Sequence, residues 1–147
     1  MEKIIISSCL LGNNCKYNGK NNYIEKIELL KDKYEIIPIC PEVMGGLSIP
    51  RIPSEINNGM VIDKCGNDVS EYFNNGANKV IDIVKNNNIK IAILKDGSPS
   101  CGSSNIYDGT FKGNKINGMG ITAKRLYDLG IKIYNENNFG ELIWLLR

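Results

Sequence analysis

Four short runs of apolar, mostly β-branched residues set the strongest limit on how this chain can fold. They cover residues 3–8, 35–39, 90–94 and 131–134, and each has the length and composition of a strand buried in a sheet. Amphipathic stretches separate the runs, and strands that alternate with helices form a mostly parallel sheet through right-handed crossovers. The pattern therefore predicts an α/β fold of three layers, with helices on both faces of the sheet.

The predicted helices lie at residues 24–31, 73–84, 121–129 and 139–146. Gly130 follows the third of them, at a position where helices commonly end. The second places one set of apolar residues on a single face: Phe73, Ala77, Val80, Ile81 and Val84. No repeat, linker or domain boundary is present, so we expect a single domain over residues 1–147.

Two stretches, residues 45–70 and 96–120, predict long loops that follow the second and third strands. The first of them includes a predicted hairpin that pairs residues 59–63 with residues 68–69. Loops of this length inside a compact domain are usually functional. We expect both at the carboxyl edge of the sheet.

Composition narrows the possible chemistry. The 147 residues include no histidine, which excludes Ser-His-Asp and Cys-His catalysis, histidine-ligated zinc and histidine general bases. A formal net charge of +2 gives no reason to expect nucleic acid or a membrane surface as a partner. The first residues are too short an apolar run for a signal peptide or a membrane span. We therefore expect a cytoplasmic protein whose thiols stay reduced.

Three of the five cysteines follow predicted strands: Cys9 after the first, Cys40 at the end of the second, and Cys101 in the loop after the third. Because the carboxyl ends of parallel strands share one sheet edge, where ligands bind, these three should converge. Cys15 lies in the same loop as Cys9 and can reach the same place, whereas Cys65 lies in the predicted hairpin turn. Free cysteines can also serve as small buried hydrophobic residues. Spacing alone leaves open both a zinc site of four thiolates and a cluster on three thiolates with an open position.

Three motifs carry a resemblance to a known family. SCLLG at residues 8–12 is followed by CKYNG at 15–19, and CPEVMGGL at 40–47 continues through PRIP and EI. LKDGSPSCG at 94–102 is followed by IYDG and GMGITA. In their order and spacing, over nearly the whole chain, these motifs resemble those of the thiouracil desulfidase (TudS-like) family.

The resemblance implies a Rossmann-like domain with a [4Fe-4S] cluster that only three cysteines bind. Carried onto this sequence, the ligands would be Cys9, Cys40 and Cys101, with Cys15 in reserve. The resemblance also implies that the open iron takes the sulfur of a thiolated uracil base or nucleotide. Water then replaces that sulfur without net redox change, and sulfide is released. The expected protein is a hydrolytic desulfidase that acts on a small thiolated pyrimidine.

Other residues of these motifs are candidates for proton transfer and substrate binding. Glu42 is the best-placed carboxylate for acid–base work, and Ser98 can relay a proton or orient the base. Arg51, Lys95 and Ser100 are candidates for contacts with the substrate. Each has a plainer alternative: a carboxylate paired with the nearby arginine or capping a helix, serines that shape a turn, and solvated cations.

A second hypothesis stays open, in which the chain is a non-catalytic zinc- or cluster-binding module or a redox sensor. That hypothesis predicts four thiolate ligands, including Cys15, and no open coordination position. A metal-free thiol enzyme is a third possibility, and it would need a cysteine with a depressed pKa in a chain that has no histidine to pair with it. One departure from the family pattern, the pair Asp96-Gly97, could alter how a substrate fits.

Overall fold

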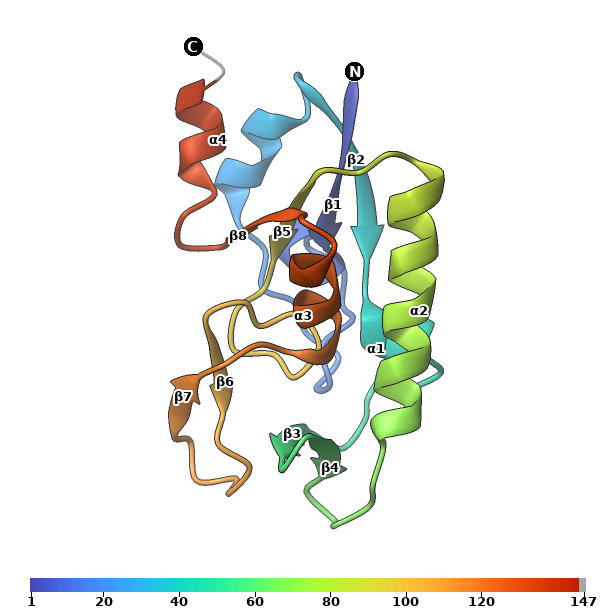
Figure 1. Cartoon of the computed structure of the whole chain (residues 1–147). Coiled ribbons are helices and arrows are strands. Elements are labelled where there is room, and N and C mark those ends of the chain that lie inside the picture. The colour runs from blue at the N-terminus through green and yellow to red at the C-terminus, as the bar shows by residue number, and fades with distance from the viewer. Residues whose placement is uncertain (146–147) are drawn as a thin grey trace.

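The computed structural model describes residues 1–145. Its centre is a parallel sheet in the order β2-β1-β5-β8, made of β1 (Glu2–Ser7), β2 (Tyr34–Ile39), β5 (Ile91–Leu94) and β8 (Lys132–Asn135) (Figure 1). All four predicted strands and their parallel arrangement are confirmed. The order of the strands reverses between β1 and β5, and folds of this kind bind ligands at the carboxyl edge of such a reversal.

Each face of the sheet has its own core. Helices cover both faces: α2 (Ser70–Asn86) and α3 (Ile121–Asp128) on one, the 3-10 helix η2 (Glu25–Leu30) and α4 (Gly140–Leu145) on the other (Figure 1). Successive residues of a strand point to opposite faces. Accordingly Ile5 packs with α2 and α3, whereas Ile4 and Ile6 pack with η2 and α4. The architecture is a three-layer α/β fold, compatible with the Rossmann-like class.

The predicted helices form, with one change of type. The stripe on α2 is buried in full: Phe73, Ala77, Val80, Ile81 and Val84. The helix predicted at residues 24–31 is η2, which is a 3-10 helix of six residues rather than an α-helix. Residue 146, the last of the final predicted helix, lies outside the described residues. Among residues 1–145, no helix has the length and apolar character needed to cross a membrane.

Both long loops fold into small hairpins beyond the carboxyl edge: β3 (Ser54–Asn57) with β4 (Met60–Asp63), and β6 (Asn105–Tyr107) with β7 (Lys115–Asn117). The predicted antiparallel pairing of residues 59–63 with residues 68–69 is present, but β4 has a longer partner, β3, that the sequence did not predict. β4 pairs along its length with β3 and meets residues 68–69 only through a bridge from Ile62 to Asp68 and one backbone hydrogen bond. The reason is local, because Asn58 and Gly59 both have positive φ and form a tight two-residue turn.

Candidate active site

A pocket of about 460 Å³ opens at the carboxyl edge of the sheet, where β1, β2 and β5 end. Cys9 lies in the 3-10 helix η1 (Ser8–Leu11) directly after β1, Cys40 follows β2, and Cys101 lies in the loop after β5. These three and Cys15 all line the pocket, so the structure brings four of the five cysteines together. Cys65 is exposed in a turn after β4 and takes no part in this lining.

Cys15 is at the centre of the contacts among the thiols. Its side chain hydrogen-bonds with those of Cys9 and Cys40, which lowers the pKa of each of these two to about 7 against the opposite effect of burial. The same hydrogen bonds raise the pKa of Cys15. Asn22 Nδ2 donates to Cys9 Sγ at 3.5 Å, whereas burial raises the pKa of Cys101 to about 12. Cys9 and Cys40 are therefore poised to ionise near neutral pH, and the thiolate is the form that binds metals.

Two glycines fix the segment that carries Cys40 and Glu42. This segment is the start of helix α1 (Pro41–Met44), and its first residue, a proline, suits the first turn of a helix. A Cβ on Gly45 would lie 1.9 Å from a backbone oxygen of α2, and a Cβ on Gly76 would lie 1.9 Å from a backbone oxygen of α1. Only glycine permits this contact, which presses α1 against α2 and holds the segment at the pocket.

Two side chains tie down the loop that carries Cys101. The buried carboxylate of Asp96 accepts the backbone N–H groups of residues 103–105, each at 3.1 Å. Ser98 Oγ accepts the N–H groups of Ser100 and Cys101 at 3.1 and 3.0 Å. The carbonyl of Ser100 in turn accepts two N–H groups from the first turn of α3. The loop is thus held from within and against α3, so that Cys101 has a defined place.

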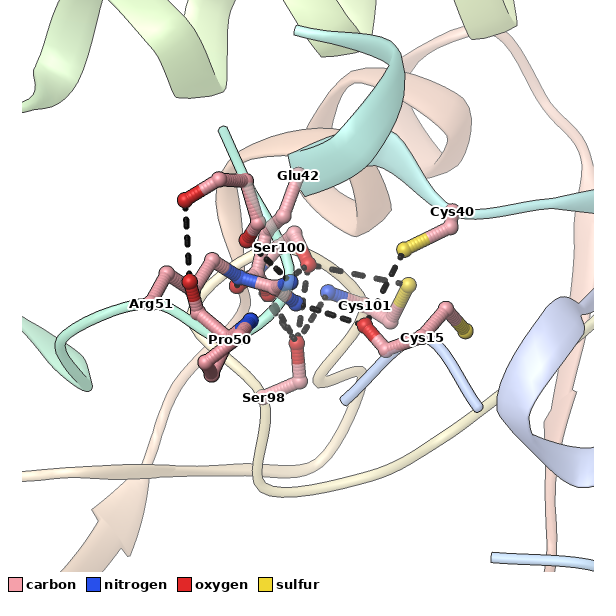
Figure 2. Close-up of polar contacts among 9 residues, drawn as sticks. Cys15, Cys40, Glu42, Pro50, Arg51, Ser98, Ser100 and Cys101 are labelled. Carbon is pink, nitrogen blue, oxygen red and sulfur yellow. Dashed lines mark hydrogen bonds and ion pairs between the residues drawn. The ribbon is translucent and has the colours of Figure 1, made fainter. Parts of the chain in front are cut away.

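Glu42 joins the two loops, as Figure 2 shows. Its Oε2 accepts hydrogen bonds from Ser100 Oγ at 2.8 Å and Ser98 Oγ at 3.4 Å, while Oε1 pairs with Nε of Arg51 at 3.1 Å. Ser100 Oγ also lies 3.8 Å from Cys101 Sγ. The alternative in which Glu42 pairs with the arginine is therefore present, but the same carboxylate also holds both predicted serines. The result is a hydrogen-bonded chain that runs from a carboxylate through a hydroxyl to a thiol.

Arg51 and Lys95, the two predicted substrate-binding cations, line the pocket and also hold protein groups. The Arg51 guanidinium donates to two backbone carbonyls, including that of Cys15 at 2.8 Å, in addition to its pair with Glu42. Its side chain is only 7% exposed. Lys95 pairs with Glu136 at 2.8 Å and keeps 29% exposure, so it is the freer of the two cations. Contact of either one with a substrate stays a prediction.

Sequence reasoning missed residues that line the pocket or hold its loops: Ser7, Asn22, Glu55, Asp96, Tyr107, Phe111 and Lys115. Two of them had a usable signal: Ser7 ends the first strand, and Asn22 follows Cys9 and Cys15 within a polar loop. Among the residues of the two hairpins, Glu55 and Tyr107 stand in the quoted motifs EI and IYDG but were assigned no role, whereas Phe111 and Lys115 had no signal. Asp96 was noted only as a departure from the family pattern, whereas its carboxylate faces the backbone of its own loop.

The donor set suits a metal centre built on thiolates. Four cysteines line the pocket with their thiols available as donors. The Glu42 carboxylate, which lies beside them, is already engaged by a guanidinium and two hydroxyls. Within residues 1–145, no three or more Cys, Asp or Glu side chains are spaced to hold a single metal ion. By their chemistry, soft thiolates fit the iron–sulfur centre that the motifs imply.

Known proteins share both the sequence and this architecture. A family model described as 2-thiouracil desulfurase matches residues 4–138. The uncharacterized protein YbbK of Bacillus subtilis (strain 168) is 41% identical over 150 residues, which cover 95% of this chain and 99% of that protein. A solved structure named as a [4Fe-4S]-dependent thiouracil desulfidase, TudS, matches with a TM-score of 0.93 and 38% identity, over 99% of this chain and 98% of that one. The family resemblance of the motifs is confirmed, and this chain belongs to the 2-thiouracil desulfurase family.

Proposed function

We propose that this protein is a desulfidase that replaces the sulfur of a thiolated uracil by oxygen, with a [4Fe-4S] cluster bound by Cys9, Cys40 and Cys101. The observation that carries this proposal is the position of Glu42, which meets the thiol-lined pocket together with two hydroxyls. A purely structural metal site has no use for a carboxylate and hydroxyls beside its thiolates. Membership of the family, and the name of the matching TudS structure, support the substrate class and the type of cluster.

The proposed reaction consumes water and yields the oxygenated pyrimidine and sulfide. One C–S bond breaks and one C–O bond forms at the same ring carbon, so no oxidant or reductant is needed. When bound, the cluster supplies a Lewis-acidic iron that no cysteine occupies and that can draw electron density from the substrate sulfur. The protein must then remove a proton from the attacking water and supply one to the leaving sulfur or to a ring nitrogen.

Glu42 performs this proton transfer in our proposal. Its carboxylate is 16% exposed and accepts hydrogen bonds from Ser98 and Ser100, so either hydroxyl can pass a proton to it from the pocket. Arg51 fixes the opposite oxygen of the carboxylate and keeps it in place. Ser98 has a second task, because its hydroxyl also holds the backbone of Cys101. The proton relay and the Cys101 loop therefore share one side chain.

One observation favours the alternative of a non-catalytic module with four thiolate ligands. Cys15 contacts both Cys9 and Cys40, which is where a fourth ligand would stand. Replacement of Cys15 by Ala distinguishes the desulfidase proposal from this alternative. Our proposal expects the Cys15→Ala protein to keep its iron and most of its activity, whereas a four-thiolate module would lose its metal.

The proposal is tested on protein purified without oxygen. We expect iron and acid-labile sulfide in the protein, and stoichiometric release of sulfide and uracil from 2-thiouracil or 4-thiouracil. Heavy-oxygen water should place its label in the product. A protein that binds iron and sulfide but releases no sulfide from either substrate would contradict the proposal and support the non-catalytic module.

A further inference from the structure

The loop between β6 and β7 holds an aromatic residue in a backbone conformation that such residues avoid. Phe111 has a φ of +58°, and the other residues besides glycine with positive φ in residues 1–145 are Asn58 and Asn88. Asparagine tolerates this left-handed region, whereas a bulky side chain is strained there. Strain of this kind persists only where the surrounding structure imposes it, and it gathers at functional sites.

A side chain from the other hairpin, Glu55, holds Phe111 in this backbone conformation. Oε1 of Glu55, in β3, accepts the backbone N–H of Gly109 at 3.0 Å and that of Phe111 at 3.1 Å. At Gly109 the two hairpins touch so closely that a Cβ would lie 2.8 Å from the backbone oxygen of Ile56. Within the loop, the Asp108 carboxylate also accepts hydrogen bonds from the N–H and the hydroxyl of the residue two positions on. The β6–β7 loop is therefore docked on β3 rather than left free in solvent.

The docked loop turns two aromatic residues toward the pocket. Tyr107 and Phe111 are both half-buried and both line the pocket that holds the cysteines and Glu42. Lys115 Nζ lies 5.6 Å from the centre of the Tyr107 ring and lines the same wall. Both hairpins lie beyond the carboxyl edge of the sheet, past the ends of the strands that supply the cysteines (Figure 1). An aromatic wall beside a reactive site suits a flat heterocycle, because every such ring has a face on which to stack.

We propose that Phe111, together with Tyr107, forms the wall on which the pyrimidine ring of the substrate stacks, and that Glu55 is the positioning residue that holds Phe111 there. This inference rests on the proposed function and adds to it the residues that recognise the ring. The inference explains why the backbone at residue 111 is strained and why the Glu55 carboxylate accepts two N–H groups of the neighbouring hairpin. A role in packing alone would affect stability and leave substrate binding unchanged.

Replacement of Phe111 by Gly is the direct test, because glycine accepts the positive φ while the ring is lost. In the cluster-loaded enzyme, we expect KM for thiouracil to rise at least about tenfold, the size typical of one lost stacking contact, with kcat and iron content nearly unchanged. Phe111→Tyr keeps the ring and should behave like the unaltered enzyme. An unchanged KM in Phe111→Gly would overturn the inference.

The role of Glu55 is tested by a pair of substitutions. Glu55→Ala removes the acceptor and should raise KM. Glu55→Gln keeps an acceptor oxygen, so its KM should stay close to that of the unaltered enzyme. Glu71→Ala, at an exposed position in the first turn of α2, is the matched control and should leave KM unchanged. Equal KM values in Glu55→Ala and the unaltered enzyme would contradict the positioning role.

Binding of uracil itself separates this inference from the proposed function. Equilibrium dialysis measures that binding without any chemistry, in the cluster-loaded protein and in Phe111→Gly. If the protein binds uracil through Phe111 but releases no sulfide from thiouracil, the stacking wall is supported and the desulfidase proposal falls. If sulfide is released and the affinity for uracil does not depend on Phe111, the desulfidase proposal stands and the wall is overturned.

Discussion

The turn that carries Cys65 and the loop that carries Cys101 use the same device with different results. In the turn, Asp63 accepts the N–H groups of Cys65 and Asn67, each at 2.9 Å. In the loop, Asp96 accepts the N–H groups of residues 103–105. Both carboxylates are nearly buried, yet Cys65 is exposed and Cys101 is 5% exposed.

The difference lies in what each segment is attached to. The Cys65 turn follows a strand of a two-stranded hairpin, whereas the Cys101 loop leaves the central strand β5 and packs on α3. Only the second is enclosed by the ends of other strands, where Glu42 accepts hydrogen bonds from the two serines of the loop. A carboxylate that collects N–H groups is thus a general way to close a loop. The position at the sheet edge, by contrast, is what places a cysteine beside a carboxylate and hydroxyls.

The largest effect that would test this comparison is expected when Cys101 and Cys65 are replaced one at a time. Cys101→Ala should abolish cluster binding and reduce activity by more than about a hundredfold, which exceeds the cost of replacing residues that only hydrogen-bond to metal ligands. Cys65→Ala should change neither. Iron content and sulfide release measure both effects. Cys101→Ser, closer in size, controls for the cavity that alanine leaves in the core, and it should also lose the cluster while the protein stays folded by circular dichroism.

The next effect concerns Glu42, whose carboxylate contacts the Cys101 loop and has no counterpart at the Cys65 turn. Glu42→Gln keeps the shape and some of the hydrogen bonds to Ser98 and Ser100 but cannot accept a proton. We expect kcat to fall by about a hundredfold to ten-thousandfold, the range of general acid–base catalysis, with iron content unchanged. Loss of iron together with activity would instead make Glu42 a part of the metal site.

The sequence pattern was sufficient for the convergence of Cys9, Cys40 and Cys101, because strand order alone brings the ends of parallel strands to one edge. It was not sufficient for the contacts of Cys15, which depend on the path of an irregular loop. The pairing of Glu42 with Arg51 was foreseen as an alternative. The hydrogen bonds of Glu42 with the serines were not foreseen, because they require the two loops to lie within hydrogen-bond distance of each other.

The hairpins show where local chemistry was present but overlooked. Asn58-Gly59 is a strong turn signal, and it would have assigned β3 as the partner of β4. The β6–β7 hairpin has no comparable signal, since its strands are three residues long and its loop is held from outside by Glu55. Elements fixed by tertiary contacts of this kind leave little trace in a single sequence.

A smaller effect is expected at Asp96. Burial alone would raise the pKa of its carboxyl, but the N–H donors of residues 97, 104 and 105 outweigh burial and hold that pKa below its ordinary value. Asp96→Asn should cost about 1.5–3 kcal/mol of stability at neutral pH, as for a hydrogen bond to a charged group, and should lower activity because the Cys101 loop loosens. Urea unfolding of protein freed of metal by a chelator measures the difference.

The pH dependence of that difference has a definite sign. Because the folded-state pKa of Asp96 lies below the unfolded value of about 3.9, the carboxylate stabilises the fold fully above that value. The contribution is lost as pH falls through the folded-state pKa. The gap between the unaltered protein and Asp96→Asn should therefore narrow in acid below about pH 4. A gap that stays constant down to about pH 3 would mean that the charge of Asp96 does not stabilise the loop.

The smallest effect is expected at Asp63, the carboxylate of the other turn. The N–H of Asn67, with those of Cys65 and Gly66, holds the pKa of Asp63 below its ordinary value, so Asp63→Asn should also lower the thermal midpoint. It should leave cluster content and kcat unchanged, because Cys65 is not at the site. Lys64 makes this a demanding test, since it lines the pocket and donates its N–H to the carbonyl of Pro53 at 2.9 Å. A rise in KM in Asp63→Asn would mean that the turn acts on the pocket through Lys64, and the contrast between the two carboxylates would then be one of degree.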